Sequence, residues 1–302
     1  MELIIIYARE RPDLVHQVAL KPVIYGSLAA RLTGVTSVVN ALGGLGFVFT
    51  SKNWLATVIK HPLLCLLRFI FDNSGGRLIV QNKEDMNVLT ESGIINSLYI
   101  RLIRGAGVDL VNYLASPLVE EVPIIVLASR MLWDKGIGEF VAAAELLKKQ
   151  GIEARFVLVG DTDAETPTAI PRLQLKKWHE QGVIEWWGYR KDMPQVLGQA
   201  HIVCLPTYYG EGVPKVLLEA MSCGRAIITT DMPGCRELIV AGVNGVLIQP
   251  RNVQSLAEAI SLLLKDRSLC KRMGIEGRKI AEAEYSIEKI VAQTFTVYEE
   301  LM

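Results

Sequence analysis

The stretch IIVLASRMLWDKGIGEFVAAAELLKKQGIEARFVLVGD, residues 124–161, decides the fold class. Its ends, residues 124–129 and 154–159, are short apolar runs rich in β-branched side chains, which are typical of buried strands. Between them, residues 138–150 place apolar side chains at helical spacing. A strand, a helix and a second strand in this order predict a βαβ unit, whose two strands lie parallel in one sheet.

The same alternation continues on both sides of this stretch. Beyond residue 161 we expect strands at 184–187, 202–205, 226–229 and 245–248, with helices at 171–181, 193–200, 214–222, 233–241, 253–264, 268–284 and 287–301. Before residue 124 we expect strands at 13–16, 37–40, 78–81 and 98–100, with helices at 1–11, 23–33 and 54–72, the last restarted at Pro62. The pattern predicts an α/β fold with two Rossmann-like domains and parallel sheets, of which the first is incomplete.

A loop that contains Pro117, Glu120 and Glu121 marks the expected boundary between the two domains. The predicted first domain covers residues 1–119 and the second covers residues 120–285. Residues 286–302 are expected to form a C-terminal helix that returns to the first domain.

Composition excludes several classes of protein. Half of the 302 residues are apolar, and 32 Lys and Arg balance 32 Asp and Glu, so no global basic field for nucleic acid exists. Five cysteines without a C-x-x-C pair, and only four histidines, argue against a disulfide framework or a zinc site and favour a reducing cytoplasm. No signal peptide is recognised at the N-terminus. Residues 32–51 are uncharged but rich in Gly, Ser and Thr, which indicates a strand and loop instead of a membrane helix.

Two cations follow the first strand of the βαβ unit. Arg130 comes directly after residues 124–129, and Lys135 stands five positions later, before the helix. In an open parallel sheet ligands bind at the carboxyl ends of the strands, and an arginine fork with a lysine point charge suits a diphosphate. The alternative is a solvated surface pair.

A second candidate site covers residues 207–219, TYYGEGVPKVLLE. Its glycines permit close backbone approach, and the helix that follows offers free amides to an anion. Glu219 stands in an apolar run, so it is either an exposed helix position or a buried carboxylate with a partner. Glu211 and Glu219 do not suit a glycosidase, because eight residues of helix would separate them by about 12 Å. The acid–base pairs of glycosidases need about 5–9.5 Å.

Taken together, these motifs resemble the family 4 retaining glycosyltransferases, which have the GT-B fold. The match rests on Glu211 and Glu219 in an E-x7-E element and on Arg130 and Lys135 in an R-x4-K-G-I element. It also includes G160-D-T-D163, W186-W-G188, D192-M-P194, G212-V-P-K-V-L-L-E-A220 and D231-M-P-G-C-R-E237. These motifs resemble the branch that extends polyprenyl-diphosphate-linked glycans in bacterial polysaccharide and glycoprotein assembly. By this resemblance the N-terminus is expected to be truncated.

The resemblance implies roles for individual residues. Catalysis is assigned to Arg130 and Lys135, which would neutralise the diphosphate, and to Glu211, which would hold the donor sugar. Donor binding is assigned to Glu219 on the ribose, to the amides of Gly212 and Val213, to Lys215, and to Tyr189 and Arg190 beside the base. The donor implied is a UDP-hexose or UDP-N-acetylhexosamine, the acceptor a lipid-linked glycan, and no metal or other cofactor is expected.

Two further expectations concern context. Residues 52–72 carry Lys52, Lys60 and Arg68 on one broad helical face among apolar residues, so they can contact an anionic membrane. The protein is then expected in the cytoplasm, peripheral on the inner face of the plasma membrane. The alternative is a pair of short helices packed in the core. The alternative to transferase activity is an inactive, donor-binding remnant or a non-catalytic component of a glycan-assembly complex.

Overall fold

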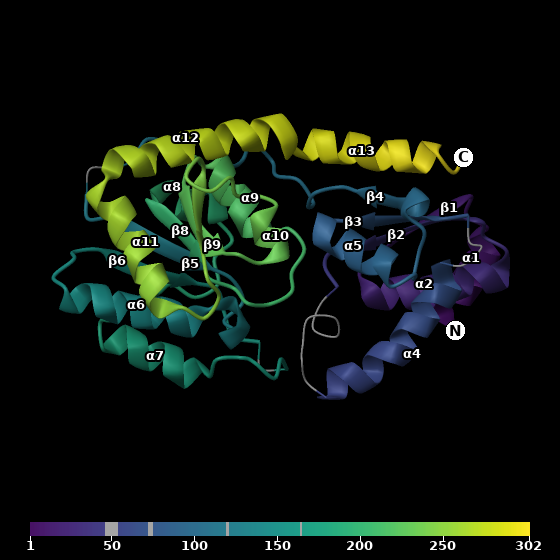
Figure 1. Cartoon of the computed structure of the whole chain (residues 1–302), viewed down its shortest axis with the longest axis horizontal. Coiled ribbons are helices and arrows are strands. Elements are labelled where there is room, and N and C mark those ends of the chain that lie inside the picture. The colour runs from purple at the N-terminus through teal and green to yellow at the C-terminus, as the bar shows by residue number, and fades with distance from the viewer. Residues whose placement is uncertain (46–53, 72–74, 119–120, 164) are drawn as a thin grey trace. The chain divides into compact units, whose positions relative to one another are not determined.

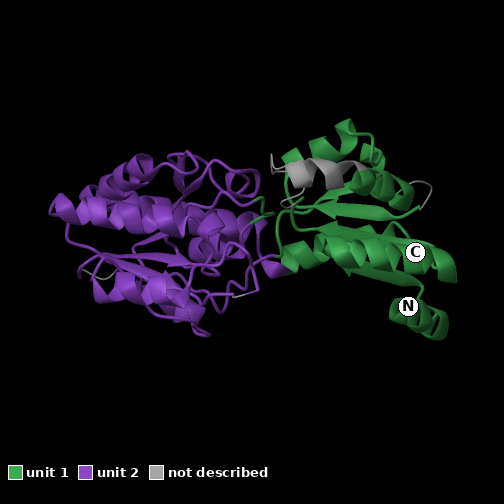
Figure 2. Ribbon diagram, turned by 90° about the horizontal axis from the view of Figure 1, so that it is seen from below, with its two compact units in different colours: residues 1–106, 210–213, 288–302 green, residues 107–209, 214–287 purple. Residues whose placement is uncertain are grey.

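A computed structural model describes residues 1–45, 54–71, 75–118, 121–163 and 165–302, and for residues 54–61 it describes the backbone alone. The chain forms two compact units (Figures 1 and 2). Unit 1 contains Met1–Ala106, Gly210–Val213 and Glu288–Met302, and unit 2 contains Gly107–Tyr209 and Pro214–Ile287.

The predicted βαβ unit forms the centre of unit 2. Strands β5 (Ile124–Ala128) and β6 (Arg155–Val159) pair in parallel, with Ile124 opposite Arg155 and Ala128 opposite Val159. Their sheet has six strands in the order β10-β9-β8-β5-β6-β7, all parallel. The other four are β7 (Glu185–Trp186), β8 (Ile202–Leu205), β9 (Ala226–Thr230) and β10 (Gly245–Ile248). Along the chain, β5, β6 and β7 lead from the centre of the sheet to one edge, and β8, β9 and β10 then lead from beside β5 to the other edge. The sheet is therefore doubly wound, as predicted.

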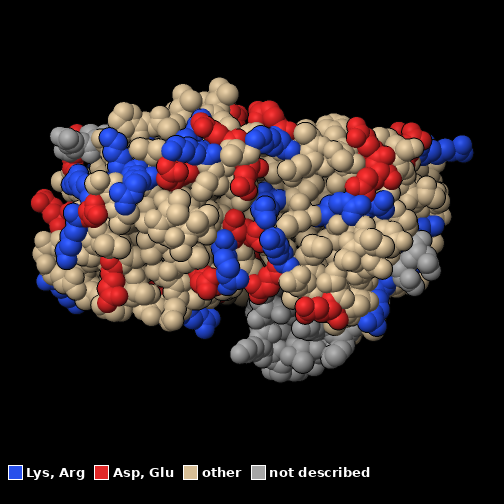
Figure 3. All heavy atoms as spheres, turned by 45° about the horizontal axis from the view of Figure 1, so that its top comes forward, with Lys and Arg blue, Asp and Glu red and all other residues tan. Residues whose placement is uncertain are grey.

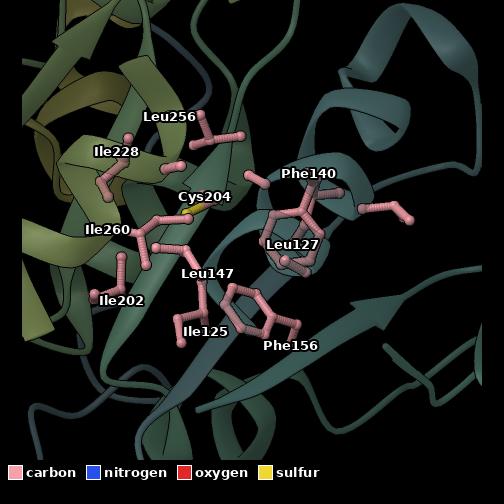
Figure 4. Packing of buried hydrophobic residues seen from close by; sticks show 14 of the residues in the cluster. Ile125, Leu127, Phe140, Leu147, Phe156, Ile202, Cys204, Ile228, Leu256 and Ile260 are labelled. Carbon is pink, nitrogen blue, oxygen red and sulfur yellow. The ribbon is translucent and has the colours of Figure 1, made fainter. Parts of the chain in front are cut away.

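Helices cover both faces of this sheet. Alternate strand residues such as Ile125, Leu127 and Phe156 share one core with α6 (Ile137–Lys149) and α11 (Val253–Lys265) (Figure 4). Within it the rings of Phe140 and Phe156 meet edge to face, with centroids 5.8 Å apart. Helix α9 contacts α8, α12 and β9. The bounds of the remaining helices are η2 (Trp133–Lys135), α7 (Arg172–Glu180), α8 (Met193–Gln199), α9 (Lys215–Ser222), α10 (Pro233–Arg236) and α12 (Arg267–Glu284).

Unit 1 holds a parallel sheet of four strands in the order β1-β2-β3-β4. One face packs on α2, α4 and α5 through a buried apolar cluster, and the other packs on α13 through Ile290 and Val297. The strands are β1 (Leu14–Val18), β2 (Ser37–Leu42), β3 (Arg77–Val80) and β4 (Ile100–Leu102). The helices are α1 (Glu2–Glu10), α2 (Leu20–Thr33), α4 (Trp54–Phe71), α5 (Lys83–Glu91), η1 (Ser97–Tyr99) and α13 (Ile287–Glu299). The predicted α/β fold with two parallel sheets is therefore confirmed.

The predicted restart of the helix at Pro62 is wrong. Helix α4 runs from Trp54 to Phe71 with Pro62 inside it. A proline removes one helical hydrogen bond, but the turns beyond it are held by packing, since Leu67 and Ile70 are buried in the unit 1 core. Residues 46–51 of the expected glycine-rich loop lie outside the described residues.

Two other helices differ from the prediction. The helix expected at 233–241 ends at Arg236, because Asn244 is fully buried and folds the following segment around its side chain. Its amide oxygen accepts from the Val240 amide at 2.8 Å, and its amide nitrogen donates to the Leu238 carbonyl at 2.8 Å. Helix α5 was not predicted, although Asn82 caps it by accepting a hydrogen bond from the Asp85 amide at 2.7 Å.

Unit 2 begins earlier along the chain than the predicted boundary at residue 119. The Val108 amide donates to the Tyr285 carbonyl at 2.9 Å, and the Ile287 amide donates to the Val108 carbonyl at 3.1 Å. These bonds fasten the segment after Gly107 to the end of α12, within unit 2. Glu288–Met302 belongs to unit 1.

Positive and negative side chains are mixed on the face of the protein that Figure 3 shows. Figure 3 shows Lys and Arg side chains interspersed with Asp and Glu over the visible face. The sequence holds equal numbers of both signs, 32 Lys and Arg against 32 Asp and Glu. Among the helices that the structure describes, none is long and apolar enough to cross a bilayer.

Glu300 joins the C-terminal end of the chain to the sheet of unit 1. Its carboxylate accepts hydrogen bonds from Arg77 of β3, with Nε at 2.5 Å, and from Arg101 of β4, with Nε at 2.7 Å. These two guanidinium groups, Arg101 foremost, lower the pKa of Glu300 to about 2. Folding therefore favours the ionised carboxylate, and this stabilisation is present above the unfolded pKa of about 4.3 and lost as pH falls toward about 2.

We expect Glu300→Gln to lower the free energy of unfolding at pH 7 by about 1 kcal/mol, a value reduced for the partial exposure of the pair. The difference from wild type should shrink as pH falls below about 4.3, because the Glu300 carboxyl of the unfolded wild-type chain then binds a proton while that of the folded chain stays ionised until about pH 2. Urea titrations at pH 7 and pH 3 measure both effects. Glu299→Gln, which changes the exposed neighbouring carboxylate, is the control. Equal unfolding midpoints of wild type and Glu300→Gln at pH 7 would contradict this account.

Candidate active site

A hollow of about 770 Å³ opens at the carboxyl ends of β5 and β6 in unit 2. Its wall includes Ala128 and Val159, the last residues of these strands. This is the edge at which open parallel sheets bind ligands. The lining is completed by Ser129, Arg130, Gly160, Asp161, Thr162, Asp163, Tyr189, Arg190, Lys191, Met193, Val216 and Glu219.

Arg130 reaches this hollow because β5 and β6 end side by side. Gly160, at φ 137°, lies so close to Ser129 that an added Cβ would stand 1.9 Å from the Ser129 carbonyl oxygen. Only glycine lets the two chain segments approach in this way. The Arg130 guanidinium then pairs with Asp163, with Nη1 3.3 Å from Oδ2. A hydrogen bond from the Thr166 hydroxyl, and to a lesser degree Arg130, lowers the pKa of Asp163.

Lys135 lies on the same connection but does not line the hollow. It ends the short helix η2 and is only 8% exposed. Its Nζ lies 5.4 Å from the centroid of the Tyr209 ring, a distance that suits a cation–π contact. The predicted cation pair therefore belongs to one loop of unit 2, while Arg130 alone of the two lines the hollow.

Glu219 is a buried carboxylate, so its interpretation as an exposed helix position is wrong. It is 7% exposed on α9, and it lines the hollow. The Tyr113 hydroxyl donates to its Oε1 at 2.9 Å, and Lys215 Nζ lies 3.7 Å from the same oxygen. Burial raises the pKa of Glu219, while the contacts with Tyr113 and Lys215 oppose that rise. No pattern in the sequence pointed to Tyr113, which stands 106 residues earlier in a segment without helix or strand.

Tyr189 and Arg190 form another part of the wall. Tyr189 is 70% exposed and follows Gly188, whose φ of 67° turns the chain out of β7. Arg190 donates to both carboxylate oxygens of Asp192 and stands 5.7 Å above the Trp187 ring. This pairing lowers the pKa of Asp192 to about 2. Arg190 is thus oriented by its own loop.

Residues Glu211, Gly212 and Val213 belong to unit 1. The Gly212 amide donates to the Gly43 carbonyl at 2.6 Å, and the Val213 amide donates to Gln81 Oε1 at 2.9 Å. A Cβ on Gly212 would stand 2.1 Å from Gln81 Oε1, so glycine is required here. The two amides that the resemblance assigns to the donor already have acceptors within unit 1.

Lys215 and the G-D-T-D turn complete the predicted residues. Lys215 is largely exposed and does not line the hollow. Asp161 pairs with Arg172 at 3.1 Å, and Asp163 with Arg130. Within the described ranges, no cluster of three or more His, Cys, Asp or Glu side chains has the arrangement of a metal site.

Most of the chain matches models of two known protein families. Residues 115–280 match the model of "Glycosyl transferases group 1", and residues 1–81 match that of "Glycosyl transferase 4-like". The first match covers the βαβ unit, the hollow and α9.

Two curated relatives are identical to the chain at about a quarter of the aligned residues. The N,N'-diacetylbacillosaminyl-diphospho-undecaprenol alpha-1,3-N-acetylgalactosaminyltransferase of Campylobacter jejuni is 27% identical over 296 residues, covering 94% of this chain and 75% of the relative. The UDP-Gal:alpha-D-GlcNAc-diphosphoundecaprenol alpha-1,3-galactosyltransferase of Escherichia coli is 26% identical over 277 residues, covering 86% of this chain and 68% of the relative.

Two solved structures show the same fold. The Anabaena protein HepE in complex with UDP has a TM-score of 0.82 and 19% identity, covering 98% of this chain and 81% of that chain. Sucrose-phosphate synthase from Thermosynechococcus elongatus has a TM-score of 0.84 and 22% identity, covering 98% of this chain and 75% of that chain.

The burial of Glu219 generates a stability prediction for the unliganded protein. Because folding raises the pKa of this carboxyl, the stability it contributes is greatest below the unfolded pKa and is lost as pH rises through the folded pKa. Glu219→Gln cannot ionise and keeps an oxygen for Tyr113. We expect its melting temperature to equal or exceed that of wild type at pH 8, with the difference smaller at pH 4.

Thermal melts between pH 4 and pH 8 test this expectation. Glu258→Gln, on the exposed side of α11, is the matched control and should follow wild type at every pH. A melting temperature clearly below wild type at pH 8 for Glu219→Gln alone would show that ionised Glu219 stabilises the fold.

Proposed function

The chain belongs to the glycosyl transferases group 1 family, and from this premise we propose that it moves a hexose or N-acetylhexosamine from a UDP-sugar to a glycan on polyprenyl diphosphate, with retention of configuration. It is a glycosyltransferase with the GT-B fold. The proposed acceptor is supported by the names of the Campylobacter jejuni and Escherichia coli relatives, both of which specify a sugar on undecaprenyl diphosphate. The name of the Escherichia coli relative also specifies a UDP-sugar donor.

One observation carries the donor proposal: the hollow of unit 2 brings a guanidinium and a buried carboxylate to the carboxyl edge of the sheet. Arg130 offers a forked, permanently charged donor that suits diphosphate oxygens. Glu219 offers an acceptor for ribose hydroxyls, and Tyr189 offers an exposed ring at the rim for the base. The roles of Lys135, Glu211, Gly212, Val213 and Lys215 remain proposals from the resemblance alone.

The proposed chemistry breaks the bond between the anomeric carbon and the diphosphate oxygen. It forms a bond from the same carbon to the oxygen of an acceptor hydroxyl, which releases its proton. Negative charge grows on the departing UDP as the bond to the diphosphate lengthens, and the proposed role of Arg130 is to stabilise that charge. We propose that Arg130 and Lys135 take the place of a metal ion. The two aspartates of the nearby turn, Asp161 and Asp163, are each paired with an arginine, Arg172 and Arg130, instead of being left to bind a metal. Transfer that persists in excess chelator supports this proposal, and transfer restored only by added divalent cation opposes it.

The proposed membrane contact narrows to part of residues 52–72. Arg68, expected to face a leaflet, donates instead to the carbonyl oxygens of Ser92 and Gly93, at 2.9 and 2.7 Å. Leu67 and Ile70 are buried in unit 1, as the core alternative required. The side chains of residues 52–61, which include both lysines, lie outside the described residues. We therefore keep these residues alone as the membrane-facing part of a protein peripheral on the inner face of the plasma membrane.

Vesicle flotation tests this narrowed contact. The wild-type chain is expected to float with anionic vesicles more than with neutral ones, and Lys52→Glu with Lys60→Glu is expected to remove most of that preference, since each lysine near such a surface contributes about 1 kcal/mol. Lys148→Glu with Lys149→Glu, on α6 of unit 2, is the charge-matched control. Equal flotation with both kinds of vesicle would leave the core alternative.

Removing the cation of the hollow tests donor binding. We expect Arg130→Ala to weaken UDP binding at least tenfold, because a charge-assisted hydrogen bond contributes about 1.5–3 kcal/mol. Transfer should fall further. Arg172→Ala is the matched control, since Arg172 also pairs with an aspartate of this turn but does not line the hollow. Calorimetry with UDP measures the affinities. Unchanged affinity in folded Arg130→Ala would remove Arg130 from the site.

Transfer of radiolabelled sugar from a panel of UDP-sugars tests the activity itself. Labelled lipid-linked product supports the transferase. UDP binding without transfer to any acceptor supports the donor-binding remnant or the non-catalytic component instead.

A further inference from the structure

Tyr113 lies in the segment through which the chain enters unit 2, and its hydroxyl contacts Glu219. The backbone of Tyr113 is held by hydrogen bonds as well. Its carbonyl oxygen accepts from Ser222 Oγ at 2.7 Å and from Arg278 Nη1 at 2.8 Å. Ser222 stands on α9, the helix that carries Glu219, and Arg278 also donates to the Ser222 carbonyl at 2.7 Å. Tyr113 is therefore anchored to the same helix at both ends.

The two oxygens of the Glu219 carboxylate have different surroundings. Oε1 accepts the hydrogen bond from Tyr113 and is the oxygen that stands 3.7 Å from Lys215 Nζ. Oε2 accepts no hydrogen bond from the described part of the chain. Glu219 is only 7% exposed, so little water is available to replace such a donor. Because Glu219 lines the hollow, its second oxygen is the one left for a ligand.

We propose that Tyr113 is a positioning residue for the donor nucleotide: its hydroxyl holds Oε1 of Glu219 and so presents Oε2 to the ribose hydroxyls. This inference rests on the proposed function, since it assigns the ribose of UDP to the hollow. Tyr113 itself does not line the hollow, so it acts through Glu219.

The physical reason is the freedom of the carboxyl group. The last torsion angle of a glutamate side chain, χ3, has a broad distribution, so a carboxylate without a hydrogen-bond partner samples many orientations. A second effect acts in the same direction, because burial raises the pKa of Glu219 and the hydrogen bond from Tyr113 opposes that rise. Tyr113 thus keeps the carboxylate both oriented and ionised, so that it can accept hydrogen bonds from the ribose hydroxyls.

The test compares UDP with 2′,3′-dideoxy-UDP, which lacks both ribose hydroxyls, by calorimetry on the full chain at pH 8. Wild type is expected to prefer UDP. Tyr113→Phe is expected to reduce that preference by about three- to tenfold, the factor that one ordinary hydrogen bond supports. Its affinity for the dideoxy nucleotide should be unchanged, because only the ribose contact depends on Tyr113.

Two further variants separate positioning from stability. Tyr285→Phe removes another hydroxyl of unit 2, which donates to the Glu237 carbonyl at 3.0 Å, and it should keep the wild-type preference. In a Glu219→Ala background, where Tyr113 has no carboxylate left to hold, Tyr113→Phe should change the preference much less than in wild type, because the two residues act as one unit.

Each contrary result has a distinct meaning. An unchanged preference for UDP in folded Tyr113→Phe, with UDP still bound by wild type, overturns the positioning role and leaves the proposed function standing. A wild type that binds both nucleotides equally overturns the ribose contact of Glu219, and the positioning role with it. A wild type that binds neither nucleotide overturns the proposed function and this inference together.

Discussion

The parallel pairing of β5 with β6 is the constraint on which the candidate site depends. It brings the carboxyl ends of both strands to one edge, where the chain after β5 supplies Arg130 and the chain after β6 supplies Asp163. Gly160 lets the chain after β6 lie against the Ser129 carbonyl oxygen, because a Cβ at residue 160 would collide with that oxygen. The hollow therefore follows from strand register and from one glycine, and its charges follow from the loops that the register brings together.

The site pairs its charges in two different ways. Arg130 and Asp163 are both partly exposed, so their pair is weak and a stronger anion can displace the aspartate. Glu219 is buried, and a buried carboxylate requires partners, which Tyr113 and Lys215 supply. This arrangement suits a ligand with a charged part and a hydroxylated part. Exposed Arg130 can exchange Asp163 for the charged part, and buried Glu219 can accept hydrogen bonds from the hydroxyls while it keeps its own partners.

Much of this arrangement could be predicted from the sequence, because strands and helices of unit 2 have strong, local patterns. The βαβ unit, the doubly wound order and the positions of Arg130 after β5 and of Glu219 on α9 all derive from residues within a few positions of one another. What could not be predicted depends on contacts between distant residues. Tyr113 reaches Glu219 across 106 positions, and buried Asn244 shortens α10 from beyond its end. Helix α4 continues past Pro62 because its later turns are packed, which propensity alone does not reveal.

A crystal structure of the chain with UDP tests the central claim, that one hollow of unit 2 holds the whole nucleotide. The account predicts a diphosphate oxygen within hydrogen-bond distance of the Arg130 guanidinium, in place of Asp163, and a ribose hydroxyl on Oε2 of Glu219 while Tyr113 stays on Oε1. UDP bound elsewhere, with Arg130 still paired to Asp163 and Oε2 without a ligand, would contradict it.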